Sequence, residues 1–283
     1  VNLTSPLSPL FAPIREAAYV GRFTRVLSTD DPTARIRTLY WDAATALLRR
    51  TQPLGIPGDT LAPPDRRHAL RLFVGYGPET IKDVLRAVHP PELTHLESLT
   101  SRPDRAHNET IDAVLTGGLL GVLAYYILMI SLLTCALQLL GWVGDRASRR
   151  TLISIVVMSG AVGVAAAILL DRTGSPLTFV GLALPFGVLA GVLLHVALQC
   201  ARRGRAVERR DGIEQALGLA VFAGVVAHFL DVQFAFSTAA TQTYFWVFAG
   251  LLVALRRHER KPADGAADER AAAPEVPQLA LPQ

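Results

Sequence analysis

The sequence predicts an all-α fold, a polytopic membrane helix bundle of about five transmembrane helices preceded by an N-terminal extracytoplasmic helical loop region. Hydrophobic residues make up 51% of the 283-residue chain, and its mean hydropathy is +0.33. The first hundred residues have ordinary polarity, so the apolar excess lies in the second half, as is typical of membrane proteins. That half contains long apolar runs, and the loops between them alternate between arginine-rich and nearly uncharged.

The five apolar runs cover residues 111–142, 151–170, 177–200, 213–236 and 237–255. At about 1.5 Å per helical residue, most of them can cross a hydrocarbon core of about 30 Å. The first run is longer than a span requires, so we expect it to project above the membrane and to present His107 outside. Pairs of small residues at four-residue spacing favour close helix packing; they are Gly117 and Gly121, Ser159 and Gly163, and Gly187 and Gly191.

Basic residues predict the orientation of the bundle. They follow the first, third and fifth runs, as Arg146, Arg149 and Arg150, then Arg202, Arg203, Arg205, Arg209 and Arg210, then Arg256, Arg257, Arg260 and Lys261. The other two loops carry only Arg172, which is beside Asp171. Because positive loops stay in the cytoplasm, we expect residues 1–110 outside and the C-terminus inside.

The chain therefore divides into an outer region (1–110), a transmembrane bundle (111–255) and a tail (256–283). The tail is rich in Ala, Pro, Asp and Glu, and we expect it to be disordered and cytoplasmic. The chain begins at Val1 without methionine, and we expect upstream membrane helices to precede it. The net charge of +4 reflects the loop arginines and does not indicate a nucleic-acid partner. Cys135 and Cys200 lie inside apolar runs and are read as small membrane-buried side chains.

Short helices are expected in the outer region. Asp31 and Pro32 form a helix start, and apolar residues at helical spacing continue to near Arg50. A proline- and glycine-rich loop follows over 51–66. A short apolar run at 70–74, an amphipathic helix over 81–88 and one or two further turns over 93–99 complete this region.

A polar cluster stands where the outer region meets the first span. Asn108 is a good N-cap, and Glu109 and Asp112 fall in the first turn, where carboxylates favour the positive end of a helix. His107 is the best general-base candidate because imidazole titrates near neutrality. A histidine that merely packs at the interface explains the same residues equally well.

Other candidate residues have an equally simple alternative. Arg35 and Arg37 could clamp a phosphate in a bidentate manner, or simply solvate their helix. The segment from Gly75 to Glu79 could admit an anion to its N–H groups, although a tight turn explains it better. His228 and Asp231 could form a functional site or a structural hydrogen bond. His89, His95 and Glu97 lack a metal-ligand spacing, so no metal site is predicted.

Several of these motifs, in this order, resemble the O-antigen ligase and O-antigen polymerase superfamily of bacterial envelope enzymes. They are Arg37 four residues before Trp41, Pro53-Leu54-Gly55, Gly75-Tyr76-Gly77-Pro78-Glu79, His107-Asn108-Glu109 with Asp112, Gly117-Gly118-Leu119-Leu120-Gly121, His228-Phe229 and Thr243-Tyr244-Phe245-Trp246. The resemblance covers about residues 20–255 and corresponds to the C-terminal part of such proteins.

This resemblance implies a metal-independent, inverting glycosyltransferase of the bacterial cytoplasmic (inner) membrane that needs no cofactor. Its donor would be a glycan on undecaprenyl diphosphate, and its acceptor a glycan or lipid hydroxyl on the outer face. His107 and Arg37 would be catalytic. His107 would accept the proton of the attacking hydroxyl or orient the acceptor, and Arg37, alone or with Arg35 or Arg105, would hold the diphosphate. Substrate binding is assigned to the flanking polar residues Arg35, Glu79, Arg105, Asn108 and Asp112, the last two also fixing the imidazole and the helix start. Transfer to protein, and a non-catalytic role in polysaccharide export, remain the alternatives.

Overall fold

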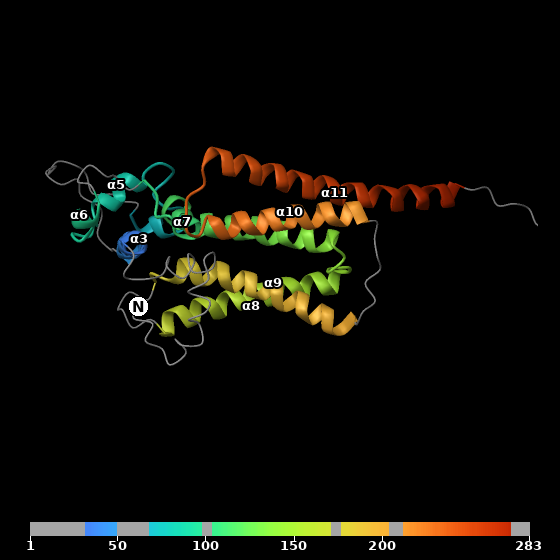
Figure 1. Cartoon of the computed structure of the whole chain (residues 1–283), viewed down its shortest axis with the longest axis horizontal. Helices are drawn as coiled ribbons and strands as arrows, with labels where there is room; N and C mark the ends of the chain where they lie inside the picture. The colour runs from blue at the N-terminus through green and yellow to red at the C-terminus, as the bar shows by residue number, and fades with distance from the viewer. Residues whose placement is uncertain (1–31, 50–67, 98–103, 171–176, 204–211, 273–283) are drawn as a thin grey trace, which may run out of the picture.

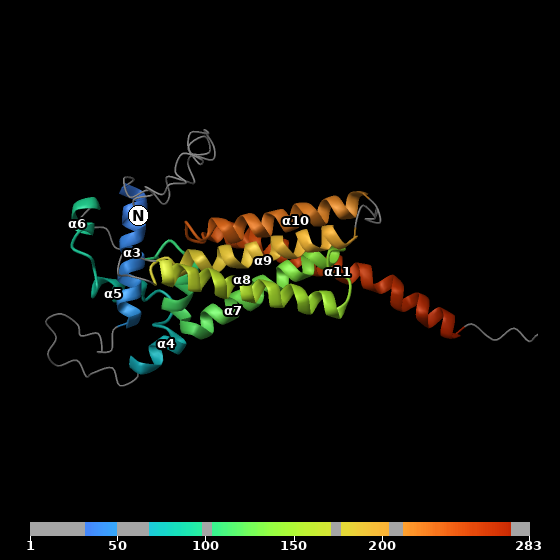
Figure 2. The same ribbon diagram turned by 90° about the horizontal axis from the view of Figure 1, so that it is seen from below.

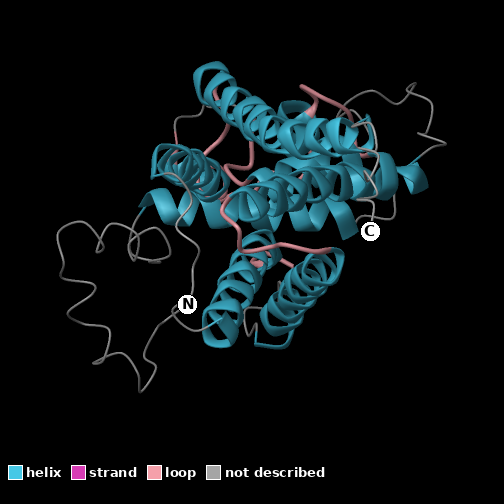
Figure 3. Cartoon of the chain, turned by 90° about the vertical axis from the view of Figure 1, so that its right-hand side faces the viewer, coloured by secondary structure: helices cyan, strands magenta, loops and turns pink. Residues whose placement is uncertain are grey.

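The computed structural model describes residues 32–49, 68–97, 104–170, 177–203 and 212–272, apart from the side chains of 68, 203, 213, 214 and 259–272. Every regular element in these ranges is a helix, and none is a strand (Figure 3). The predicted all-α fold is therefore confirmed for the described part of the chain. The loop at 51–66 and the end of the tail, residues 273–283, lie outside the described residues.

Short helices come first and long helices follow. The short ones are α3 (Pro32–Arg49), the 3-10 turn η2 (His68–Leu70), α4 (Arg71–Val74), α5 (Ile81–Arg86) and α6 (Leu93–Leu96). The long ones are α7 (Glu109–Leu139), α8 (Arg146–Leu170), α9 (Val180–Arg203), α10 (Gly212–Asp231) and α11 (Ala239–Ala272). Figure 1 shows the long helices running side by side, with the short helices gathered at one end.

Among the described residues, three helices are long and apolar enough to cross a membrane, namely Glu109–Leu139, Arg146–Leu170 and Val180–Arg202. The chain thus has the character of a membrane protein, and the expected count of about five spans is not confirmed. The apolar part of α10, Gln215–Asp231, is shorter. The expected continuation of this helix to Phe236 is wrong, because the chain turns after Asp231.

Close packing of α8 on α9 follows from their small residues, as predicted. A Cβ on Gly187 would lie 2.6 Å from the carbonyl oxygen of Ser159, and one on Gly163 would lie 2.6 Å from that of Ala183. Such contacts need glycine. The pair Gly117 and Gly121 does not act in this way, since a Cβ on Gly117 would meet no atom of another element.

The arginine-rich ends of the long helices lie at the end of the bundle opposite α3 (Figure 1). The described arginines that alternate between loops in the sequence are therefore also gathered at one end of the bundle in space. α11 continues past the predicted last span to Ala272, so the first part of the expected disordered tail is helical.

α3 lies across the end of the bundle, as Figure 2 shows. Its predicted bounds are confirmed, and its apolar face is buried, including Trp41 at 1% exposure. The Trp41 indole N–H donates to the carbonyl oxygen of Ala106 at 2.9 Å, and its ring meets Phe179 edge-on. Thr178 also donates a hydrogen bond to the Asp42 carboxylate. These contacts hold α3 against the segments that precede α7 and α9.

Candidate functional site

His107 lies in the segment between α6 and α7, two residues before α7 begins. Its φ of 56° is in the left-handed region, which Asn, Asp and His adopt more readily than other non-glycine residues. Its ring lies parallel to that of Tyr40, with centroids 6.2 Å apart, and edge-on to that of Phe236 at 5.4 Å. The imidazole is thus held between α3 and the turn after α10.

The hydrogen bond of the imidazole indicates which ring nitrogen can act as a base. Nδ1 lies 3.3 Å from the carbonyl oxygen of Arg105. A carbonyl oxygen can only accept, so this contact places the proton on Nδ1 and the lone pair of the neutral ring on Nε2.

The surroundings of His107 favour its neutral form. Burial lowers the pKa of His107 below its ordinary value of 6.5, and the positive charge of Arg37 acts in the same direction. The Arg105 carbonyl and the carboxylates of Asp104 and Glu97 oppose this shift in pKa. An imidazole with a lowered pKa is unprotonated at neutral pH, which a general base requires.

Arg37 and His107 are far apart in the sequence and close in the fold. Arg37 is on α3, three residues before Tyr40, and the two share a helix face. That face meets His107, and the Arg37 charge acts on the pKa of the imidazole. The structure therefore brings together the two residues for which a catalytic role was predicted.

Asn108 holds the segment that carries His107. Its side-chain oxygen accepts from the N–H of Ile111 at 3.0 Å, so the predicted N-cap is confirmed. Its amide donates to the carbonyl oxygens of Gly181 at 3.1 Å and of Gln233 at 3.0 Å. The side chain is fully buried. Asn108 thus ties the starts of α7 and α9 to the end of α10.

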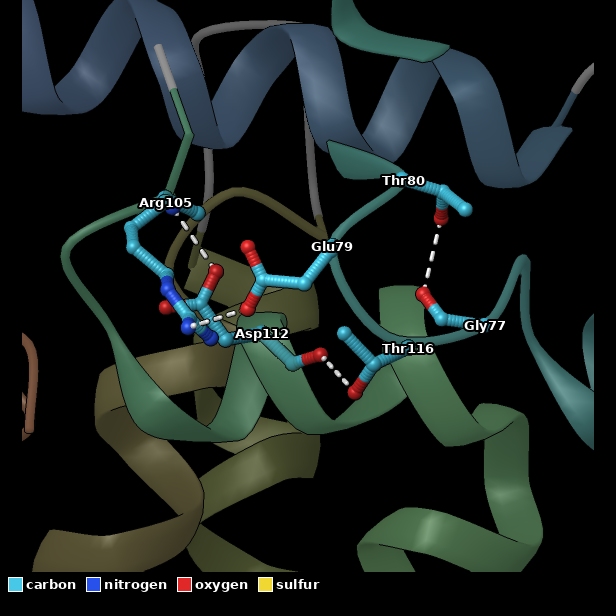
Figure 4. A network of polar contacts seen from close by, with 7 residues as sticks. Gly77, Glu79, Thr80, Arg105, Asp112 and Thr116 are labelled. Atoms are coloured by element: carbon cyan, nitrogen blue, oxygen red, sulfur yellow. Dashed lines mark hydrogen bonds and ion pairs between the residues drawn. The ribbon is translucent and has the colours of Figure 1, made fainter. Parts of the chain in front are cut away.

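Asp112 is buried in the first turn of α7. Its Oδ1 accepts from the N–H of Ala106 at 2.7 Å, and its carbonyl oxygen accepts from the Thr116 hydroxyl at 2.7 Å (Figure 4). Within the described residues, neither Asp112 nor Asn108 is hydrogen-bonded to the His107 imidazole. They fix the backbone on either side of it.

The other predicted substrate-binding side chains are engaged in ion pairs. Arg35 forms a bidentate pair with Glu92, the residue before α6, at 2.9 Å from Nε to Oε1 and 2.6 Å from Nη2 to Oε2. This hydrogen bonding raises the pKa of Arg35 and lowers that of Glu92. Arg105 pairs with the largely exposed Glu79 at 3.3 Å, as Figure 4 shows.

Tyr40, Gln233 and Phe236 belong to this site and were missed by the sequence analysis. Gln233 accepts from the Thr110 hydroxyl at 3.0 Å and donates to the Phe229 carbonyl oxygen at 3.0 Å. Gln233 could have been identified from the sequence, because a polar side chain within an apolar run usually needs a hydrogen-bond partner or has a function. Nothing in the sequence pointed to Phe236, because an apolar residue at the end of the predicted fourth span is expected to face lipid or the bundle.

A cavity of about 880 Å³ is present in the bundle, and its lining does not include His107. Its lining is mostly apolar and comes from α9, α10 and α11, with His228 and Asp231 among the lining residues. The His228 ring stacks on that of Phe245 at 4.7 Å. The structure thus separates this pair from the His107 cluster. Among the described residues, no group of three or more His, Cys, Asp or Glu side chains could hold a metal ion.

Comparison of the chain with protein-family models, with curated proteins and with solved structures gave no match.

Proposed function

We propose that this protein is a membrane glycosyltransferase that moves a glycan from undecaprenyl diphosphate to an acceptor hydroxyl on the outer face of the cytoplasmic membrane. The motif resemblance suggests an O-antigen ligase or polymerase, with transfer to protein as the variant within that family. Membrane lipids surround the bundle, residues 1–110 lie outside and the C-terminus is cytoplasmic. Three long apolar helices, and the arginine-rich ends of the long helices at the end of the bundle opposite α3, support this arrangement.

The observation that carries the proposal is the placement of His107 beside Arg37. In the reaction, the acceptor oxygen attacks the anomeric carbon of the donor sugar, and the bond from that carbon to the diphosphate oxygen breaks. The hydroxyl proton passes to Nε2 of His107, and the bonding electrons leave with the diphosphate. Arg37 stabilises the charge that develops on the leaving group.

The proposed base is neutral and its orientation is fixed. The Arg105 carbonyl, Tyr40 and Phe236 hold the imidazole, and burial lowers its pKa. Because Arg35 is paired with Glu92, we assign binding of the diphosphate to Arg37. We assign Arg35 and Glu79 to binding of the sugar portion, where their exposure to solvent is no obstacle.

The test replaces His107 by asparagine, which tolerates the left-handed backbone but cannot act as a base near neutral pH. We expect His107→Asn to lower transfer by about 10²–10⁴-fold while protein level and thermal unfolding stay unchanged. The matched control is His95→Asn, at an exposed position of α6. Transfer from donor lipid to acceptor is measured with the full-length protein in membranes. Wild-type transfer by a well-folded His107→Asn protein would exclude the general-base role.

The second candidate function is a non-catalytic membrane component of polysaccharide export. The observation in its favour is that Asn108 and Asp112 are buried and bonded within the protein, as a purely structural junction would require. The same assay separates the two functions. An export component shows no transfer with purified donor and acceptor, and its His107→Asn variant exports polysaccharide normally.

A further inference from the structure

A second feature at the outer end of the bundle is an apolar surface on α4. Leu70 at the end of η2 and Leu72, Phe73 and Val74 of α4, here called the α4 patch, are between 43% and 53% exposed. Four large apolar side chains exposed within five residues mark an interaction site. Beside the patch, α7 exposes Leu119, Leu120 and Leu123 to a similar extent. These three residues belong to the first candidate membrane span.

The segment after α4 is bonded to α7 at a break in that helix. Gly118 has non-helical angles, φ 62° and ψ −160°, inside α7. Just before this break, the carbonyl oxygens of Leu115 and Thr116 accept from the N–H groups of Tyr76 at 2.7 Å and of Gly77 at 3.0 Å. Figure 4 shows Gly77 next to Thr116. The main chain that follows α4 thus contacts the main chain of α7 about two turns after α7 begins.

Two glycines make this contact possible. A Cβ on Gly118 would overlap the main chain of Phe73, and a Cβ on Gly75 would overlap that of Thr116. Both glycines also have a positive φ. Irregular backbone at membrane depth is stable only where other protein groups satisfy it. The Gly75–Gly77 segment provides those groups for α7.

The side chains at the edges of the segment suit a membrane surface. The Arg71 guanidinium lies over the Tyr76 ring, 5.6 Å from its centroid. Arginine and tyrosine are favoured where lipid meets water, because each combines an apolar body with a polar end.

We propose that residues 68–77 form an interfacial membrane element, with the α4 patch immersed in the acyl chains of the leaflet at the α3 end. The patch continues the lipid-facing surface of α7, and lipid is the solvent that this surface already requires. The element lies at the depth of residues 115–118, where its N–H groups donate to the α7 carbonyl oxygens just before the break at Gly118. This inference does not depend on the proposed function.

The test places an environment-sensitive fluorophore on a single cysteine in a background without Cys135 and Cys200, in bilayers containing brominated lipid. We expect Phe73→Cys to be quenched by that lipid to about the same extent as Leu123→Cys, the lipid-facing reference. Lys82→Cys, exposed on α5, is the aqueous reference and should respond only to iodide in the buffer. A label at 73 that behaves like the one at 82, or that neither quencher reaches, would overturn the proposal.

A glycine pair provides the matched control. Gly118→Ala places a methyl group against the main chain of Phe73, whereas Gly117→Ala places one in open space. We expect Gly118→Ala to reduce lipid quenching at position 73 and to increase iodide quenching, and Gly117→Ala to leave both unchanged. Equal behaviour of the two variants would contradict the role of the Gly75–Gly118 contact. Quenching of the label at 123 checks that the bundle is intact.

Discussion

The side-chain amide of Asn108 donates to the main-chain carbonyl oxygen of Gln233, 3.0 Å away and 125 residues later in the chain. This bond closes the α3 end of the bundle, because the same amide also reaches Gly181 at the start of α9. The N–H of Glu109 donates to the Val232 carbonyl oxygen alongside it. His107 precedes Asn108, so the imidazole is positioned by a junction of three helices.

Removal of this junction should destabilise the fold strongly. Asn108→Ala deletes the cap of α7 and leaves two buried carbonyl groups without their donor, so we expect a loss of about 2–4 kcal/mol in the free energy of unfolding. Asp145→Ala is the control, because Asp145 caps the start of α8 in an exposed position. That change should cost only about 0.5–2 kcal/mol. Unfolding by sodium dodecyl sulfate measures both, and equal losses would show that the junction adds nothing beyond capping.

Arg37 and Arg49 test the diphosphate role on one helix. A leaving diphosphate needs a planar, always-charged fork, so we expect Arg37→Lys to lower kcat by about 10²-fold. Arg49 is exposed at the other end of α3, and Arg49→Lys should be silent. The assay is glycan transfer in membranes at saturating donor. Equal tolerance at the two positions would make Arg37 a solvating residue.

The lowered pKa of His107 predicts the acid side of the pH profile. The base form of the imidazole persists below its ordinary pKa, so we expect the acid limb of kcat/KM to lie below pH 6.5. Asp104 opposes this shift through its negative charge, and Asp104→Asn should therefore move the limb to still lower pH. Asp83→Asn, on the exposed face of α5, should leave it unchanged. A limb above pH 6.5 would be incompatible with the buried imidazole as the base.

Orientation can be tested at two described, exposed positions. Single cysteines at Lys82 and at Ala147, in a background without Cys135 and Cys200, are treated with an impermeant thiol reagent on intact cells. Because the arginine-rich ends should be cytoplasmic, we expect labelling at position 82 and protection at position 147 until the cells are opened. The reverse pattern would place the His107 site in the cytoplasm and exclude the proposed reaction.

Local features of the sequence predicted the helices well. The start at Pro32 and the cap at Asn108 depend on residues within one turn of each other, so they can be read directly from the chain. The same holds for the glycines between α8 and α9, whose spacing alone indicates a close-packed face. The alternation of arginine-rich and nearly uncharged loops predicted that the arginine-rich loops share one side. The arginine-rich ends of the long helices do lie at the same end of the bundle.

Only the tertiary structure decided which residues meet at the α3 end of the bundle. It placed Glu92 on Arg35, Gln233 on Asn108, and Tyr40 and Phe236 on His107, all across separations that no local pattern encodes. It also gave Gly118 its role, because a glycine inside an apolar run reads as helix until another main chain is seen to pack against it. Helical periodicity records what each segment buries, whereas a polar contact between segments depends on how the helices pack together.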